Sequence, residues 1–95
     1  MRESEFGLEI RKWALPLGWH YYHTYNSRRS DIGFPDTVLV KDDLAIFAEL
    51  KQQLRKPTPE QIAWLEALAK VKRTECYIWR IDDMEEIINR LEEGR

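Results

Sequence analysis

Three charged residues near the middle of the chain have the types and the spacing for chemistry on an anionic substrate. Asp36 stands before one apolar run, and Glu49 and Lys51 stand two positions apart at the end of the next run. Carboxylate oxygens bind hard divalent cations, and a lysine beside them can orient or deprotonate a water molecule. The three side chains can act together only if the fold brings them to one place.

The residues between them predict a β-hairpin that does so. Two apolar runs with strand composition flank Asp42-Asp43, which reads as a two-residue turn. Counting back along both strands from that turn places Asp36 directly opposite Glu49. Opposed residues share one face of a sheet, with Cβ atoms about 4.5–5.5 Å apart. Lys51 projects from the same face, about 6.6 Å farther along its strand.

This predicted convergence has an electrostatic consequence. Two carboxylates so close repel each other unless a positive charge lies between them. A divalent cation with oxygen ligands supplies that charge, lowers the pKa of bound water and polarises a phosphoryl oxygen. Because no Cys/His cluster competes, the set of Asp36, Glu49 and Lys51 favours phosphodiester hydrolysis over zinc chemistry. The alternative is that Asp36 merely ends a loop and the other two form an ordinary surface pair.

The first half of the chain contains the elements that precede this hairpin. A helical repeat of apolar residues predicts a helix over about residues 3–15, which Pro16 and Gly18 end. The alternating aromatic stretch 19–25 predicts a strand, and the polar stretch 26–35 predicts a loop. The apolar positions of the predicted helix are Phe6, Ile10, Trp13 and Leu17.

The second half supplies a helix, a strand and a last helix. Thr58 can cap a helix, Pro59 suits its first position, and Gln61 stands where a capping box has Glu or Gln. Residues 76–79 predict a fourth strand, and Asp82 predicts the cap of a final amphipathic helix. The predicted order is α-β-β-β-α-β-α, an α/β fold around a small mixed sheet.

Length and composition set the outer limits. Ninety-five residues make a single domain, 1–95, and 43% hydrophobic residues without a low-complexity tract predict a folded chain. The apolar runs are too short for a membrane span, and the N-terminus lacks the apolar core of a signal peptide. Cys76 is the only cysteine, so no internal disulfide forms. These points predict a cytoplasmic protein without membrane contact.

The charge pattern is a weak guide to partners. A net charge of −2 is a poor signature of a nucleic-acid binder. It does not exclude one, because local clusters matter more and a bound cation offsets carboxylates. The locally basic stretches are 28–29, 51–56 and 70–73.

Several ordered motifs together resemble the virus-type replication-repair nuclease (VRR-NUC) family of the PD-(D/E)xK superfamily. They are Ser27-Arg28-Arg29-Ser30, Gly33-Phe34-Pro35-Asp36, Ala48-Glu49-Leu50-Lys51, and Thr58-Pro59-Glu60-Gln61 with Trp64. The resemblance extends from Glu3 to about Leu91. It implies a restriction-endonuclease-like core and Mg²⁺- or Mn²⁺-dependent endonuclease activity, with no organic cofactor.

The resemblance also implies roles for individual residues. Asp36 and Glu49 become metal ligands together with the backbone carbonyl of Leu50, and Lys51 becomes the catalytic lysine. The family's acidic residue on the first helix corresponds to Glu3, with Glu5 and Glu9 as the alternatives.

Further residues border this implied site. Gln61 corresponds to the family's active-site glutamine, although it is equally well explained as a helix cap. The implied DNA contacts are Ser27, Arg28 and Arg29, followed by Arg55 and Lys56. The stretch 19–25 adds two histidines on opposite faces of a strand, a poor metal pair. We expect His20 to be structural and leave His23 as a possible DNA contact.

The expected function is a structure-selective DNA endonuclease of replication, repair or recombination. Members of the family without extra modules are phage-type proteins that resemble Holliday-junction resolvases, so we expect a homodimer acting on branched DNA in a bacterial or phage-infected cell. One alternative is a nuclease for flapped, nicked or duplex DNA. Another is a non-catalytic DNA-binding or assembly module with the same fold.

Overall fold

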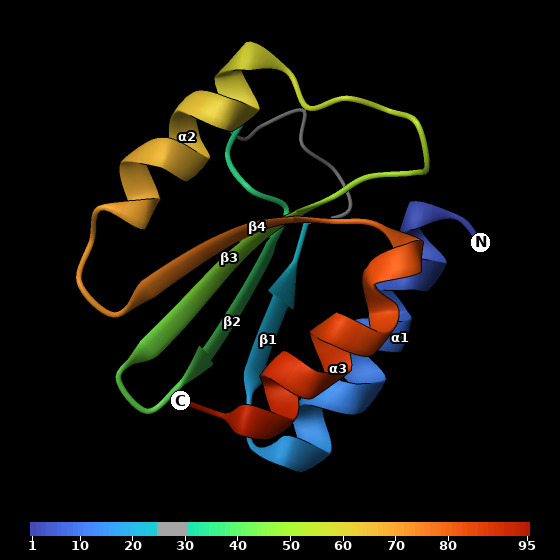
Figure 1. Ribbon diagram of the computed structural model, residues 1–95, viewed down its shortest axis with the longest axis vertical. Helices are drawn as coiled ribbons and strands as arrows, with labels where there is room; N and C mark the ends of the chain where they lie inside the picture. The colour runs from blue at the N-terminus through green and yellow to red at the C-terminus, as the bar shows by residue number, and fades with distance from the viewer. Residues whose placement is uncertain (25–30) are drawn as a thin grey trace.

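The computed structural model describes residues 1–24 and 31–95, which form a four-stranded sheet with helices on both faces (Figure 1). The sheet order is β1-β2-β3-β4, with α1 and α3 on one face and α2 on the other. The elements are α1 (Glu3–Ala14), η1 (Leu15–Leu17), β1 (His20–His23), β2 (Thr37–Lys41), β3 (Leu44–Leu50), α2 (Pro59–Ala69), β4 (Thr74–Trp79), η3 (Ile81–Asp83) and α3 (Met84–Glu93). The predicted fold class and element order are confirmed.

The central hairpin has the predicted register. Strands β2 and β3 are antiparallel, with Lys41 paired to Leu44 and Thr37 paired to Ala48. Asp42 occupies the turn with a positive φ of 54°, a conformation that Asp tolerates better than most residues. Because β1 is antiparallel to β2 and β4 is parallel to β3, the sheet is mixed.

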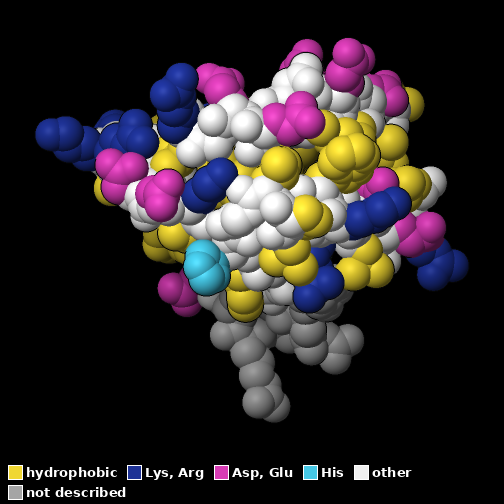
Figure 2. All heavy atoms as spheres, turned by 90° about the horizontal axis from the view of Figure 1, so that it is seen from below, with side chains coloured by type: hydrophobic (Ala, Val, Ile, Leu, Met, Phe, Trp, Pro, Cys, Tyr) yellow, Lys and Arg dark blue, Asp and Glu magenta, His cyan; other side chains and the backbone are white. Residues whose placement is uncertain are grey.

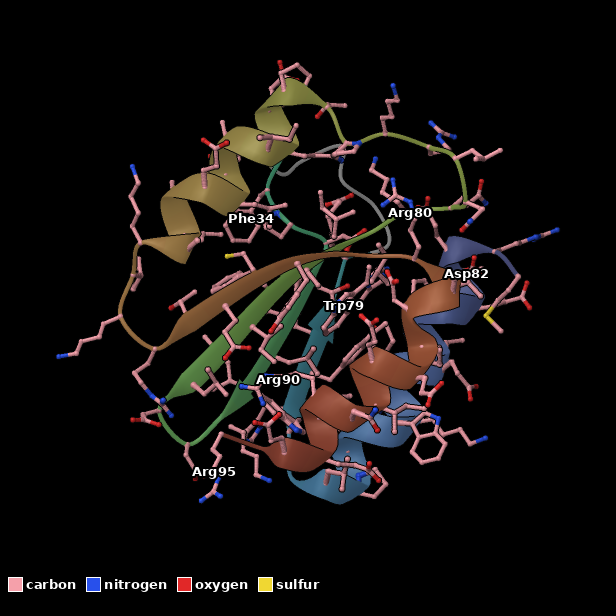
Figure 3. The ribbon with its side chains drawn as sticks, viewed as in Figure 1. Phe34, Trp79, Arg80, Asp82, Arg90 and Arg95 are labelled. Atoms are coloured by element: carbon pink, nitrogen blue, oxygen red, sulfur yellow. The ribbon has the colours of Figure 1, made fainter. Side chains whose placement is uncertain are left out.

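The two faces of the hairpin serve different purposes. Leu39, Ile46, Ala48 and Leu50 are fully buried against α1 and α3. The opposite face packs on α2, where Phe34 makes edge contacts with Phe47 and Trp64. Figure 3 shows Phe34 beneath α2 and Trp79 on the side of the sheet toward α3.

Helix α1 differs from its predicted apolar face. Its buried residues are Phe6, Gly7, Ile10 and Ala14, whereas Trp13 is 39% exposed. The small residues let α1 approach β1 closely, so that the Tyr21 hydroxyl donates to the Gly7 carbonyl at 2.8 Å. The face of α1 that packs on the sheet therefore does not include Trp13. The predicted helix also ends at Ala14, because η1 tightens the last turn before Gly18.

The final helix begins later than predicted. Asp82 was expected as its cap, but the chain first forms η3, and Asp83 accepts a hydrogen bond from the Arg80 amide at 2.8 Å. Asp82 instead accepts a hydrogen bond from the Gln53 side chain. Trp19 fixes the other end of α3, since its indole N–H donates to the Leu91 carbonyl at 2.9 Å.

The surface shows mixed charge. On the face in Figure 2, basic and acidic side chains alternate with apolar ones, and no continuous basic patch is visible. Within the described residues, the helices are too short or too polar to cross a membrane.

Candidate active site

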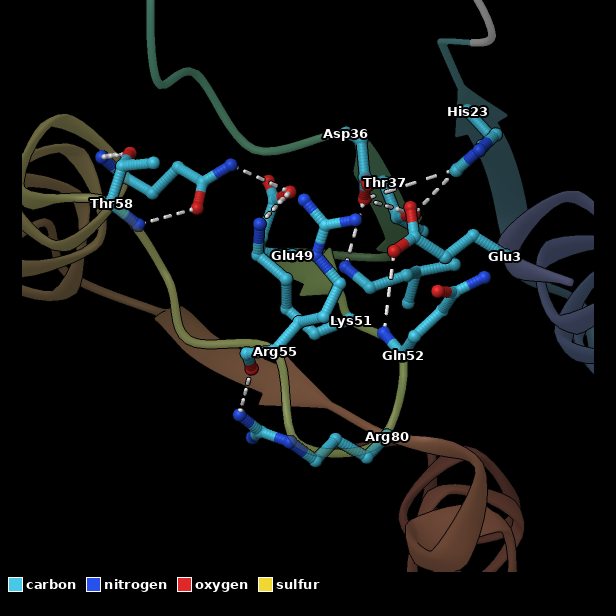
Figure 4. Close-up of polar contacts among 12 residues, drawn as sticks. Glu3, His23, Asp36, Thr37, Glu49, Lys51, Gln52, Arg55, Thr58 and Arg80 are labelled. Atoms are coloured by element: carbon cyan, nitrogen blue, oxygen red, sulfur yellow. Dashed lines mark hydrogen bonds and ion pairs between the residues drawn. The ribbon is translucent and has the colours of Figure 1, made fainter.

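The predicted acidic cluster lies in a pocket where β2 begins and β3 ends. The pocket has a volume of about 520 Å³ and is walled by α1, β1, the 31–36 segment, β3 and α2. Figure 4 shows Asp36, Glu49, Lys51 and Glu3 gathered around it. The wall contains all four side chains together with Gln61, His23 and Tyr22.

Asp36 is held by the sheet. One of its oxygens, Oδ1, accepts the Leu50 amide N–H at 3.1 Å and the Thr37 hydroxyl at 2.9 Å. Burial raises the pKa of the Asp36 carboxyl, and the nearby charge of Glu3 raises it further, although the two hydrogen bonds and His23 act in the opposite direction. The carboxylate is therefore costly to charge without a cation.

Glu49 is the most buried member, with 6% of its surface exposed. Burial is the first cause that raises the pKa of Glu49 to about 7, and the adjacent negative charge of Asp36 is the second. Lys51 lowers it, but not enough to cancel burial. Burial and the charge of Asp36 thus favour the protonated form of this carboxyl, and a divalent cation would compete with the proton for it.

Lys51 reaches the acids from the end of β3. Its Nζ lies 4.0 Å from Glu49 Oε2, and its side chain is only 11% exposed. The Lys51 amide donates to the Trp79 carbonyl at 2.9 Å, which ties its backbone to β4. The structure brings Asp36, Glu49 and Lys51 together as predicted, and their catalytic role remains a prediction.

Among the three candidates on α1, Glu3 is the one in the pocket wall. Its Oε2 accepts the Gln52 amide at 3.3 Å, and its charge raises the pKa of both Asp36 and Glu49. Glu5 instead accepts from the Arg2 amide as part of the helix cap. As a metal ligand Glu3 remains a prediction.

Gln61 satisfies both of its sequence interpretations at once. Its side-chain Oε1 accepts the Thr58 backbone N–H at 2.9 Å, and its backbone N–H donates to Thr58 Oγ1 at 3.2 Å. The two bonds complete a capping box. Its Nε2 donates to Glu49 Oε2 at 3.0 Å. The helix cap therefore also positions a site carboxylate.

His23 is closer to the acids than the sequence indicated. Its Nδ1 lies 2.8 Å from Thr37 Oγ1 and 4.0 Å from Asp36 Oδ1. His23 pairs with Thr37 across β1 and β2. Because no short turn links β1 to β2, local rules could not predict this pairing from the sequence.

The proposed DNA contacts are placed only in part. Ser27, Arg28 and Arg29 lie outside the described residues. Arg55 and Lys56 are exposed on the segment after β3, where the Arg55 carbonyl accepts a hydrogen bond from Arg80 at 2.6 Å. In Figure 4 the Arg55 side chain extends toward Glu49 and Asp36.

The donor set fits a hard cation with few protein ligands. Across residues 1–24 and 31–95, no three His, Cys, Asp or Glu side chains are arranged to hold a metal ion as they stand. Magnesium, however, is commonly bound by one or two carboxylates and keeps several waters. Asp36 and Glu49 supply the carboxylates. The Leu50 carbonyl is a further oxygen on the same strand edge, because the Leu50 amide already points at Asp36.

Comparisons with known proteins address the fold. No protein-family model and no curated protein matches the chain. A solved structure described as a VRR_NUC domain protein does match, with a TM-score of 0.71 and 19% sequence identity, over 100% of this chain and 91% of the other. The chain has the VRR-NUC fold. The family resemblance drawn from sequence motifs is thus confirmed at the level of the fold, and the restriction-endonuclease-like architecture with it.

Proposed function

We propose that this VRR-NUC-fold domain is a metal-dependent nuclease that hydrolyses phosphodiester bonds in DNA. The observation that carries the proposal is the convergence of Asp36, Glu49 and Lys51 in one pocket, with Lys51 Nζ 4.0 Å from Glu49 Oε2. Burial raises the pKa of both carboxyls, and the charge of Asp36 raises that of Glu49 further, so the charged pair is unfavourable for folding alone. A bound cation would offset that cost.

Each residue then has a defined task. Asp36 and Glu49 would hold Mg²⁺ or Mn²⁺ through their carboxylate oxygens, and the Leu50 carbonyl and Glu3 would be the further oxygen donors. When bound, the cation lowers the pKa of water and offsets charge on the phosphate. Gln61 holds Glu49 by its 3.0 Å hydrogen bond and so fixes the carboxylate plane.

Lys51 is placed to handle the attacking water. Its ammonium lies beside Glu49 and its side chain is largely buried. From there it can orient the water and stabilise the hydroxide that attacks phosphorus. The new bond joins the water oxygen to phosphorus, and the bond that breaks joins phosphorus to the leaving sugar oxygen. The attacking water gives up a proton to solvent, and the leaving oxygen takes one up from solvent. Arg55 and Lys56 on the adjacent exposed segment are placed to contact phosphates beside the cut.

A cleavage assay tests this proposal. Duplex, flap, splayed-arm and four-way DNA are incubated with the protein in Mg²⁺, in Mn²⁺ and in EDTA. Metal-dependent cleavage of any of them, lost in Lys51→Ala, supports the nuclease. Binding of DNA without cleavage in either metal would favour the non-catalytic module instead.

We further propose that the active form is a homodimer that cuts branched DNA, four-way junctions above all. Support comes from the outer side of β4: in the described part of the chain, this strand has a strand neighbour only in β3. An apolar groove runs beside it between α2 and β4. Resolution of a symmetric junction needs two related cuts, which a two-fold dimer provides.

The charges around β4 favour a second copy in antiparallel orientation. Lys70 and Lys72 precede the strand, and Asp82 and Asp83 follow it. In a two-fold antiparallel pair the basic end of one β4 meets the acidic end of the other, and Cys76 near mid-strand approaches its counterpart. Light scattering and a short bis-maleimide cross-linker, with Cys76→Ser as control, test this. A monomer that cuts flaps but not junctions would reject the dimer and leave the nuclease.

A further inference from the structure

Two buried polar side chains outside the proposed reaction contact Asp36 from the sheet. Thr37 is fully buried, and the His23 side chain is 6% exposed. The Thr37 hydroxyl donates to Asp36 Oδ1 at 2.9 Å, and His23 Nδ1 lies 2.8 Å from the same hydroxyl oxygen. The three groups therefore form a chain of hydrogen bonds that ends on a site carboxylate (Figure 4).

The direction of the chain follows from counting protons. A threonine hydroxyl has one hydrogen to donate, and here it goes to the Asp36 carboxylate, which has none. The Thr37 oxygen must then accept from His23, so His23 bears its hydrogen on Nδ1. The order of donation is His23 to Thr37 to Asp36.

The buried position of Thr37 on the sheet indicates that its hydroxyl does more than fill space. Thr37 shares its face with Leu39, and its partner across the hairpin is Ala48; all three are fully buried. Burial of a hydroxyl is unfavourable when it lacks a hydrogen bond, and valine fills the same volume without that cost. The two contacts at 2.8 and 2.9 Å compensate the cost of burying the Thr37 hydroxyl.

The same contacts determine which oxygen of Asp36 faces a ligand. Oδ1 accepts both the Thr37 hydroxyl and the Leu50 amide, so its lone pairs are committed to the sheet. Oδ2 is left as the oxygen with capacity for a cation. The donors are rigid, because His23 and Thr37 are paired residues of β1 and β2, and the Thr24 amide donates to the Asp36 carbonyl at 2.9 Å.

We infer that His23 and Thr37 are positioning residues that lock Asp36 with Oδ2 presented to the divalent cation. This inference rests on the proposed function. Groups that orient a ligand from behind typically contribute 10–100-fold to metal affinity when they are removed singly. The hydrogen bonds act on the orientation of Asp36, while the water and the phosphate are handled by other residues.

Direct binding of Mn²⁺ to the DNA-free protein, measured by titration calorimetry, tests the inference. Thr37→Val keeps the volume and removes the donor, so Mn²⁺ affinity should fall by about 10–100-fold. Thr37→Ser restores the donor and should bind within about threefold of the parent. Thr74→Val, at the far end of the sheet, is the matched control and should leave affinity unchanged. His23→Asn keeps an N–H near the Nδ1 position and should bind more tightly than His23→Leu.

A second readout needs no metal. Long-range ¹H–¹⁵N spectra of the imidazole should show His23 with its hydrogen on Nδ1, and this preference should be lost in Thr37→Val. An Nε2–H tautomer in the parent protein overturns the relay. So does a Thr37→Val protein that is folded and binds Mn²⁺ as tightly as the parent. If the parent neither binds Mn²⁺ nor cuts DNA, the proposed function fails and the positioning role with it.

Discussion

Gln61 joins the first turn of α2 to Glu49, with its Nε2 3.0 Å from Glu49 Oε2 and its Oε1 2.9 Å from the Thr58 amide. The two contacts fix the amide orientation, because the oxygen faces a donor and the nitrogen faces an acceptor. One side chain thus caps a helix and braces a buried carboxylate. The two roles can be separated by substitution.

Gln61→Glu should lower cleavage by roughly 10–100-fold while the stability of the metal-free helix cap is largely kept. A glutamate still accepts the Thr58 amide, but it replaces a donor to Glu49 with a second negative charge. Thr58→Ala should do the reverse, costing about 1 kcal/mol of stability with cleavage mostly retained. Thermal unfolding and cleavage rates on one DNA substrate check both variants. Equal loss of cleavage in the two would mean that only the cap matters.

Lys51→Ala should reduce cleavage by roughly 10²–10⁴-fold, the range expected for a group that assists proton transfer. The variant should still bind DNA, measured by fluorescence anisotropy in Ca²⁺, within a few-fold of the parent. Lys51→Met keeps the apolar stem and controls for lost packing. Lys12→Ala removes an exposed lysine that does not belong to the pocket wall and should leave cleavage unchanged. Near-normal cleavage by both Lys51 variants would remove this residue from the mechanism.

Glu3→Gln should weaken Mn²⁺ binding by about tenfold, because it removes a carboxylate from the pocket wall. Glu5→Gln and Glu9→Gln are the matched controls on the same helix, since neither residue belongs to that wall. Calorimetric titration compares the three proteins. An unchanged affinity in Glu3→Gln, with a loss in one of the others, would move the role along α1.

Glu49 gives the metal-free protein a distinct pH dependence. The pKa of Glu49 is raised from its ordinary value of 4.5 to about 7, so the folded protein binds the Glu49 proton more tightly than the unfolded chain does. This stabilisation is fully present below about pH 4.5 and is lost as pH rises through 7. Metal-free protein should therefore lose roughly 1–3 kcal/mol of stability between pH 5 and pH 8. Mn²⁺ should reverse the trend, because it binds the charged form. Denaturant unfolding at several pH values measures both curves.

Two variants isolate the contribution of Glu49 to this pH dependence. Glu49→Gln cannot ionise, so it should flatten the curve between pH 5 and pH 8 and stabilise the metal-free protein at pH 8. Glu75→Gln removes a carboxylate whose pKa is lowered by its hydrogen bonds to Arg90, so its own stability change lies at acidic pH, below about 4.5. Glu75→Gln should lower stability by a similar amount at every pH between 5 and 8, so the slope of stability against pH should not change. A sloping Glu49→Gln curve would assign the effect to another group.

The parts of the site that local rules determine could be predicted from the sequence. A two-residue turn sets the register of the whole β2–β3 hairpin, so Asp36, Glu49 and Lys51 follow from counting. The capping box at Thr58 is equally local. In both cases a few adjacent residues determine the geometry, whatever packs against them.

The parts of the structure that depend on contacts between distant segments could not be predicted from the sequence. His23 reaches Thr37 only through the β1–β2 pairing, which no short turn specifies. Trp13 has helical apolar spacing but is partly exposed, because Gly7 and Ala14 decide which side of α1 fits the sheet. The late start of α3 is a different case, because it is set locally: the Arg80 amide takes Asp83 as its acceptor and not Asp82.

Gly33 controls how closely the segment before Asp36 approaches α2. Its φ is +88°, and a Cβ placed there would lie 2.5 Å from the Glu60 carbonyl carbon and 2.7 Å from the Glu60 oxygen. Those atoms belong to the backbone of the first turn of α2, so they cannot move without moving Gln61. The neighbouring Phe34 fixes the same junction through its edge contact with Trp64.

Gly33→Ala should therefore damage stability and the site together. We expect a loss of roughly 2–4 kcal/mol, since the strained φ and the backbone collision add. Cleavage and Mn²⁺ affinity should fall too, because the displaced helix start weakens the hydrogen bond between Gln61 and Glu49. Gly18→Ala is the matched control: its φ is +93°, but a Cβ there meets only the Lys41 side chain at 3.6 Å. It should cost about 1 kcal/mol, with cleavage unchanged. Equal stability losses and equal cleavage in the two variants would show that close approach at Gly33 is not what positions the site.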